Sequence, residues 1–218
     1  MNVYLIVEGH GEKKVYAHWV PLVNPSLTVV NSLDEVQHNN LIIYSGGGYP
    51  HYIEVIEAGV EDVVTNEQLD RLVIAIDSEE MSYKDKRREI EQVVKALGKN
   101  LDYKIIVQHF CLETWALGNK TIVSRNPKDI HLRKYRGYFD VLTKDPEFLP
   151  GYPADNLNRS QFAAHYLRKL LNEKYKNLTY TKRNPHALLH NKYFERVKIR
   201  LQTTGHITSF NDFLAAFV

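Results

Sequence analysis

The sequence has few of the features typical of membrane proteins, secreted proteins or P-loop nucleotide hydrolases. Cys111 is its one cysteine, which excludes an internal disulfide and any multi-cysteine zinc site. No apolar run approaches the roughly 20 residues that cross a bilayer, and the first residues lack the basic region and cleavage site of a signal peptide. A G-x-x-x-x-G-K-[ST] loop is absent, so ATP hydrolysis by the P-loop route is not expected. These absences predict a cytoplasmic protein without a membrane segment.

Charge is unevenly distributed along the 218 residues, although the formal net charge is only +2. Residues 1–119 contain 10 Lys and Arg against 18 Asp and Glu, whereas residues 120–218 contain 18 against 8. An acidic half can hold cations, and a basic half can face a polyanion. The alternative is that the halves are solvated surfaces of opposite sign that dock on each other.

Short apolar runs alternate with amphipathic segments over the first half of the chain. Val3–Val7 is a continuous apolar run that ends at Glu8, as expected of a buried strand. Further strands are expected at residues 41–44, 72–76 and 104–107, with residues 27–30 as an additional candidate. Helices are expected at residues 11–20, 52–64, 83–97 and 113–117, with Pro21 ending the first. Strands alternating with helices predict an α/β fold around a largely parallel sheet with flanking helices.

Composition changes after Gly118, where prolines punctuate a looped, basic region. Apolar residues at helical spacing then predict helices near residues 130–142, 158–172, 193–202 and 209–218. The sequence therefore predicts an α/β domain over residues 1–118, followed by a basic, mostly helical C-terminal region over residues 119–218.

Acidic residues or glycines follow three of the expected strands. Glu8 follows the first, with Glu12 near the first turn of the next helix, and Gly46–Gly48 follows the second. Asp77 and Glu79 follow the third, and their spacing places both on one side of an extended segment. Because ligands bind beyond the carboxyl ends of parallel strands, we expect these groups to converge there. A hard divalent cation, Mg²⁺ or Mn²⁺, would relieve the repulsion between the carboxylates.

Each of these residues also has a structural interpretation. Glu12 can favour a helix N-terminus through the helix dipole. Asp77 can cap a helix, Glu79 can be solvated, and Gly46–Gly48 can form a tight turn that requires positive φ. The joint placement at strand ends is what favours a functional site.

The same residues resemble the motifs of the Toprim family, which includes topoisomerase, primase and OLD-type nuclease domains. The resemblance lies in Val7-Glu8-Gly9 after the first strand, a glycine turn after the second and Ile76-Asp77-Ser78-Glu79 after the third. It covers roughly residues 1–118. Glu8 with Glu12 is similar to the two-metal arrangement of OLD-type nucleases, and Glu113 with Trp115 resembles an E-x-W signature of small bacterial Toprim-like proteins. Glu79 departs from the family pattern, which has Asp there.

The resemblance implies a Toprim-like fold and a metal-dependent nuclease, with Glu8 as general acid/base or metal ligand. The metal ligands it implies are Glu8, Glu12, Asp77, Glu79 and Glu113. It also implies a basic residue that stabilises transition-state charge, for which Lys134, Lys182 and Arg183 are candidates. The catalytic residues expected from the resemblance are therefore Glu8, Asp77, Glu79 and, as the basic residue, Lys182. Small proteins of this kind resemble effectors of bacterial antiviral defence that act beside an ATPase partner.

Cations and aromatic residues are interleaved in the basic half. In one cluster, Arg133, Lys134 and Arg136 lie between or near tyrosines. A second cluster contains Lys174-Tyr175-Lys176 and, a few residues later, Tyr180 followed by Lys182 and Arg183. Cations neutralise phosphates and tyrosines stack on unpaired bases, so we expect binding of DNA or RNA without sequence specificity. The alternative is that the tyrosines pack beneath the long stems of Lys and Arg.

Two other functions remain open. The chain can be a non-catalytic regulatory subunit that binds a nucleotide or a partner at the acidic rim. It can also be a structural subunit whose basic half docks on an acidic ATPase.

Overall fold

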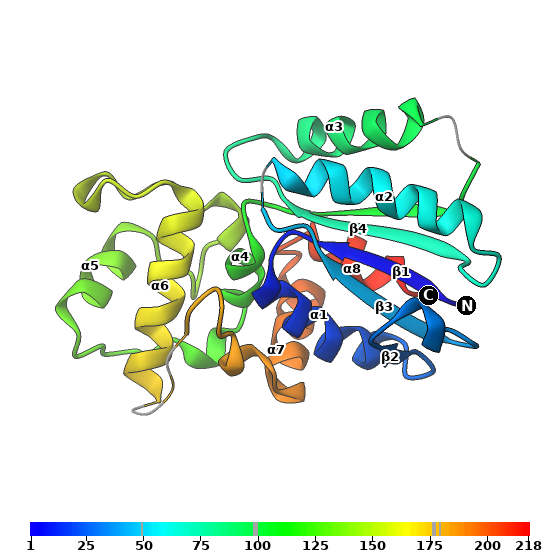
Figure 1. Cartoon of the computed structure of the whole chain (residues 1–218). Coiled ribbons are helices and arrows are strands. Elements are labelled where there is room, and N and C mark those ends of the chain that lie inside the picture. Colours follow the sequence, from blue (N-terminus) through cyan, green and yellow to red (C-terminus); the bar gives the residue numbers. More distant parts are fainter. Residues whose placement is uncertain (49, 98–99, 176–177, 179) are drawn as a thin grey trace. The chain divides into compact units, whose positions relative to one another are not determined.

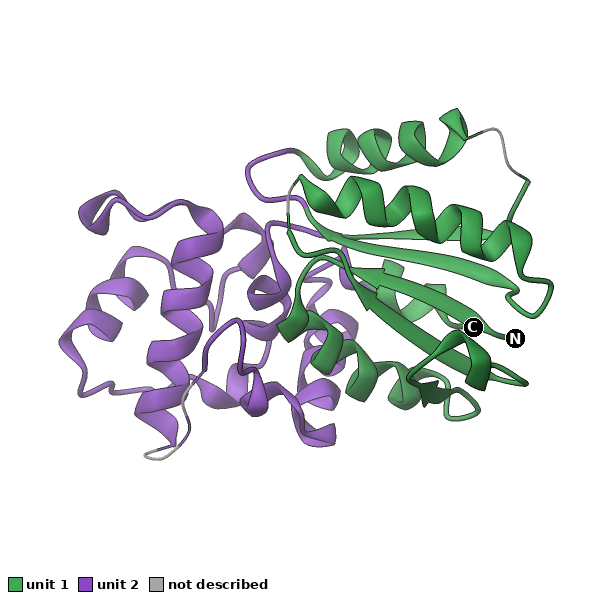
Figure 2. Cartoon of the chain, viewed as in Figure 1, with its two compact units in different colours: residues 1–77, 82–107, 211–218 green, residues 78–81, 108–210 purple. Residues whose placement is uncertain are grey.

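The chain forms two compact units in a computed structural model that describes residues 1–48, 50–97, 100–175, 178 and 180–218. Unit 1 comprises Met1–Asp77, Ser82–Val107 and Asn211–Val218, and unit 2 comprises Ser78–Met81 and Gln108–Phe210 (Figure 2). The units therefore divide differently from the predicted domains at residue 118. The chain leaves unit 1 as β5 ends and returns to it for the last eight residues, which local composition does not indicate.

Unit 1 is an α/β unit whose elements lie close to the predicted ones (Figure 1). Its elements are β1 (Val3–Val7), α1 (His10–Val23), β2 (Thr28–Val30), the 3-10 helix η1 (Leu33–Glu35), β3 (Asn40–Ser45), α2 (His51–Thr65), β4 (Arg71–Asp77), α3 (Tyr83–Ala96), β5 (Tyr103–Gln108) and α8 (Phe210–Ala216). The candidate strand at residues 27–30 exists as β2, which pairs with β3.

The five strands form one parallel sheet in the order β2-β3-β1-β4-β5. The prediction of an α/β fold with a largely parallel sheet, flanking helices and a helical C-terminal region is confirmed. β1 lies at the centre, paired with β3 on one side and with β4 on the other. A parallel sheet covered on both faces requires strands that are apolar throughout, and all five residues of β1 are buried.

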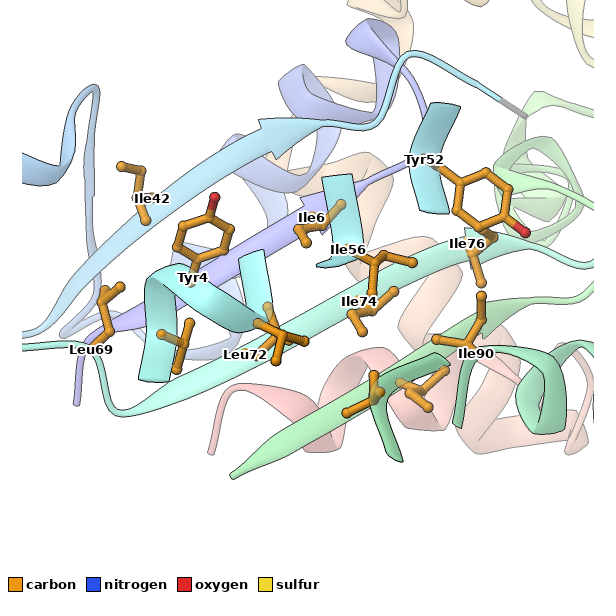
Figure 3. Close-up of a cluster of buried hydrophobic side chains, with 14 of the residues drawn as sticks. Tyr4, Ile6, Ile42, Tyr52, Ile56, Leu69, Leu72, Ile74, Ile76 and Ile90 are labelled. Carbon is orange, nitrogen blue, oxygen red and sulfur yellow. The ribbon is translucent and has the colours of Figure 1, made fainter. Parts of the chain in front are cut away.

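Alternate residues of the strands pack on opposite faces of the sheet. Tyr4 and Ile6 of β1, with Ile74 of β4, contact Ile56 of α2 and Ile90 of α3 in one apolar cluster (Figure 3). α1 covers the other face (Figure 1). The aromatic ring of Phe213 in α8 packs edge-on against Tyr16 of α1 at 5.2 Å between centroids. This contact gives α8 its place in unit 1.

Pro21 does not end α1, and that prediction was wrong. The helix continues to Val23, with Pro21 inside its last turn. Proline lacks the N–H that would donate to the carbonyl four residues earlier, so Pro21 removes one helical hydrogen bond close to the end of the helix. The buried residues Trp19 and Val20 precede it, and the Asn24 N–H donates to the Val20 carbonyl at 2.9 Å to close the helix.

Unit 2 is helical and irregular, and its helices are shorter or longer than predicted by a few residues. Its elements are α4 (Leu112–Ala116), η2 (Lys120–Ile122), α5 (Ile130–Tyr138), η3 (Pro146–Phe148), η4 (Pro153–Asp155), α6 (Arg159–Lys174), η5 (His186–Leu188) and α7 (Asn191–Thr204). Tyr135 of α5 packs edge-on against Phe162 and Tyr166 of α6. Across the described residues, no helix combines the length and apolarity that a membrane crossing needs.

Candidate functional site

The carboxyl ends of β1 and β4 lie at a topological switch point of the sheet. From β1 the chain turns through α1 towards β2 and β3, whereas from β4 it turns through α3 to β5 on the other side. α1 and α3 cover opposite faces, so the two connections diverge at this point (Figure 1). Ligands of open α/β sheets bind in the crevice that such a divergence leaves.

Glu8 and Asp77 meet at this switch point. Glu8 directly follows β1, and Asp77 is the last residue of β4. The backbone N–H of Asp77 donates to the Glu8 carboxylate at 3.2 Å from nitrogen to oxygen. Asp77 is only 5% exposed, and Glu8 is half-buried. Two residues that lie 69 positions apart in the chain are thus in contact within unit 1, through the backbone of Asp77 and the side chain of Glu8.

The glycine turn after β3 holds the backbone around Glu8. The Gly46 N–H donates to the Val7 carbonyl at 2.7 Å, and the Gly48 N–H donates to the Glu8 carbonyl at 3.1 Å. Gly47 and Gly48 have φ of 74° and 87°, which side chains disfavour. The glycines are therefore explained by the tight turn that they form. The hydrogen bonds of this turn also hold the backbone of Glu8 in place.

Replacing Gly46 with alanine is expected to destabilise unit 1 by about 2 kcal/mol. A Cβ at this position would lie 2.7 Å from the Tyr52 Cβ, and the backbone of α2 would have to move. Gly137→Ala in α5 is the matched control, because a Cβ there meets nothing within 4 Å and alanine favours a helix. Urea denaturation should show a lower midpoint for Gly46→Ala alone; equal midpoints would contradict the tight packing.

Glu12 caps α1 and lies near a buried tyrosine. The Gly9 N–H donates to the Glu12 carboxylate at 2.8 Å, a capping contact at the helix N-terminus where the structural interpretation placed only an interaction with the helix dipole. One turn further on, the Tyr16 hydroxyl is fully buried and has no hydrogen-bond partner among the described residues. Burial raises the pKa of Tyr16 well above its ordinary value, and the charges of Glu12, Asp77 and Asp212 raise it further. The phenol therefore lies in the negative field of several carboxylates.

The donor set at the switch point suits a hard cation. Within the described residues, no group of three or more His, Cys, Asp or Glu side chains is arranged to hold a metal ion. Mg²⁺ commonly keeps several waters and binds through one or two carboxylates together with substrate phosphates. Glu8 and Asp77 fit that mode by their chemistry, because both carry carboxylate oxygens and the two residues are in contact where β1 and β4 end.

Glu79 belongs to unit 2 and has an unusual backbone. Its φ is 48°, so the segment is not extended there and the alternation expected between Asp77 and Glu79 does not apply. The Glu79 N–H donates to the Phe110 carbonyl at 3.0 Å, which fixes this left-handed conformation. Strained residues of this kind persist where surrounding contacts determine them and are frequent at functional sites. The Glu79 side chain is exposed and lines a cavity of unit 2.

Glu113 is buried within unit 2. It lies in α4 and is 2% exposed, and its carboxylate accepts a hydrogen bond from the Tyr180 hydroxyl at 2.7 Å. Two roles are predicted for Glu113 from its sequence context, a helix start and a metal ligand. The hydrogen bond adds a third, because it anchors the segment that carries Lys182 and Arg183.

The basic residues of α5 divide into exposed and engaged groups. Arg133 and Lys134 are exposed. The Arg136 guanidinium donates to the Ser124 carbonyl at 2.5 Å and pairs with Asp140 at 3.1 Å, so its contacts are structural. Tyr135 is buried, which agrees with the packing alternative for this tyrosine. Lys176 of the second basic cluster lies outside the described residues.

Two groups that sequence reasoning did not single out emerge from the fold. Tyr16 could not be recognised from the sequence, because its position in the helical pattern is the same as that of an ordinary core residue of α1. Arg168 and His165 lie on the exposed side of α6 and line the same cavity as Glu79. No motif marks them, because their neighbours in space are distant in sequence.

Comparison with known proteins identifies no relative. No family model, curated protein or solved structure matches the chain. The resemblance to Toprim domains therefore rests on the short motifs after β1, β3 and β4.

Proposed function

We propose that the chain is a Mg²⁺- or Mn²⁺-dependent nuclease that hydrolyses phosphodiester bonds of DNA or RNA. The contact between Glu8 and Asp77 at the switch point carries the proposal. Two residues that carry oxygen ligands, in contact on strand ends fixed by a parallel sheet, suit a divalent cation of this class. Glu12, Glu79 and Glu113 remain further proposed ligands, on the grounds of sequence.

A bound divalent cation supplies Lewis-acid polarisation of the phosphate and a lower pKa for water. The chain's own contribution is to hold and orient. The Asp77 N–H fixes one oxygen of Glu8, and the glycine turn fixes the Glu8 backbone. Glu8 is the half-buried member of the pair, so it is the one proposed to accept or donate a proton, while the buried Asp77 supplies charge.

Cleavage assays test this proposal. Supercoiled plasmid, linear duplex DNA and tRNA are incubated with the purified protein in Mg²⁺, in Mn²⁺ and in EDTA. Cleavage that requires the cation and is lost in Asp77→Asn supports the nuclease. Undetectable metal binding by calorimetry would favour the regulatory or structural subunit instead.

A further inference from the structure

A polar cavity of about 400 Å³ lies within unit 2. Its walls come from three segments: the exposed side of α6, the turn that follows Tyr180, and the Glu79 loop. The polar residues that line it and that matter below are Asn158, Gln161, His165, Arg168, Lys182 and Glu79.

The α6 wall is one stripe of side chains. Gln161, His165 and Arg168 are spaced by four and three residues, which places them along one side of the helix. The opposite side is buried through residues such as Phe162 and Tyr166. Asn158 begins α6 with a reciprocal capping box to Gln161, which fixes the first turn beside the cavity. Arg168 is therefore presented by a rigid element.

The second wall is a tight turn anchored in the interior. Thr181 and Asn184 form an antiparallel bridge, with the Asn184 N–H donating to the Thr181 carbonyl at 3.0 Å. Lys182 lies at the tip of this turn. The preceding residue, Tyr180, is buried and donates its hydroxyl to Glu113 at 2.7 Å. The anchor holds the position of the Lys182 backbone beside α6.

The third wall is tied to the start of α6. The Arg159 N–H donates to the Glu80 carboxylate at 3.1 Å, and the Ser160 hydroxyl donates to the Phe110 carbonyl at 3.3 Å. The Glu79 N–H also donates to the Phe110 carbonyl. These contacts hold the Glu79 loop against α6 within unit 2.

The chemistry of the walls matches a phosphate with its sugar. Arg168 and Lys182 are cations, and Asn158 and Gln161 carry amides that bind hydroxyls or phosphate oxygens. Burial lowers the pKa of His165, and the charge of Arg168 lowers it further, so this side chain is a neutral hydrogen-bonding group at pH 7. Glu79 is the one carboxylate among the described residues that line the cavity.

The described lining residues of the cavity offer little aromatic surface for a base. Tyr180 is the one Phe, Tyr or Trp among them and its ring is buried, and the His165 imidazole is half-buried. A volume of about 400 Å³ is at the small end of ligand sites. Both features favour contact with one sugar–phosphate unit of a strand over stacking on bases or enclosure of a duplex.

We propose that this cavity binds the sugar–phosphate backbone of a single nucleic-acid strand, with Arg168 and Lys182 on the phosphate. The proposal rests on the proposed nuclease function and names its substrate class, a single strand bound without base readout. Glu79 opposes the phosphate when no cation is present, so the cavity binds the strand more tightly once that charge is removed.

Fluorescence anisotropy with labelled ten-nucleotide oligo-dT and oligo-U, in EDTA, tests the cavity apart from catalysis. Arg168→Ala is expected to bind about tenfold more weakly, and its slope of log affinity against log salt should fall by about 0.7. Glu79→Gln should bind about threefold more tightly, by loss of one repulsive charge. Arg88→Ala, on the exposed side of α3 in unit 1, is the control and should be unchanged.

The outcomes separate this proposal from the nuclease. If binding depends on Arg168 but no metal-dependent cleavage occurs, the binding cavity is supported and the proposed nuclease function is contradicted. If the protein cleaves nucleic acid but Arg168→Ala leaves both strand binding and KM unchanged, only the proposal for the cavity is contradicted. An equal loss in Arg133→Ala would also overturn it, because binding would then be spread over the basic surface. A duplex that binds as tightly as the single strand would overturn the strand preference.

Discussion

Replacing Asp77 with asparagine is expected to lower the rate of Mg²⁺-dependent cleavage by about a thousandfold. Asparagine keeps the shape of the side chain and the backbone N–H that holds Glu8. It removes the negative charge that Asp77 contributes at the end of β4, next to the end of β1 that carries Glu8. The remaining charge of Glu8 holds a divalent cation more weakly, so the loss should appear in both metal affinity and rate.

Stability distinguishes this loss from unfolding. Asp77 is 5% exposed, and burial of a carboxylate is costly in free energy, so the neutral amide should leave the unfolding midpoint unchanged or raise it. Asp34→Asn makes the same change on an exposed residue of η1 and should keep full activity. Wild-type rates in Asp77→Asn would refute the assignment of the carboxylate pair.

Replacing Arg200 with methionine is expected to destabilise unit 2 by about 3 kcal/mol. Arg200 is 2% exposed in α7, and its guanidinium donates to the carbonyls of Val141, Leu142 and Lys144 at 2.8–3.2 Å. Burial lowers its pKa to about 10, so the group stays charged at neutral pH. Methionine fills much of the space but leaves these buried carbonyls without their donor.

Arg196→Met is the control, because Arg196 is exposed on the same helix. Its unfolding free energy should change by no more than about 0.5 kcal/mol. Thermal and urea denaturation of both variants give the comparison. If Arg200→Met unfolds at the midpoint of Arg196→Met, the loop of residues 141–144 does not depend on the buried guanidinium.

The strands of unit 1 were predictable because each is an apolar run bounded by turn residues. Val3–Val7 coincides with β1, and even the short β2 follows the candidate at residues 27–30. The position of Glu8 and Asp77 also followed from the rule that parallel strands end at one edge. What composition could not predict was that Phe213 packs on Tyr16, because that contact joins residues almost two hundred positions apart.

The parts of the site that lie on irregular backbone were not predictable. Glu79 was expected on an extended segment, yet its hydrogen bond to the Phe110 carbonyl imposes a left-handed conformation. Glu113 faces Tyr180 across 67 positions, and no local pattern reports that pairing. The antiviral setting and the ATPase partner remain predictions from the family resemblance.

A crystal structure of the protein soaked in Mn²⁺, recorded at the manganese absorption edge, tests the carboxylate pair most directly. We expect an anomalous peak within about 2.5 Å of oxygens from both Glu8 and Asp77, and its absence from Asp77→Asn. Crystals that show no manganese at these two side chains, at millimolar Mn²⁺, would contradict the proposal that they bind the cation.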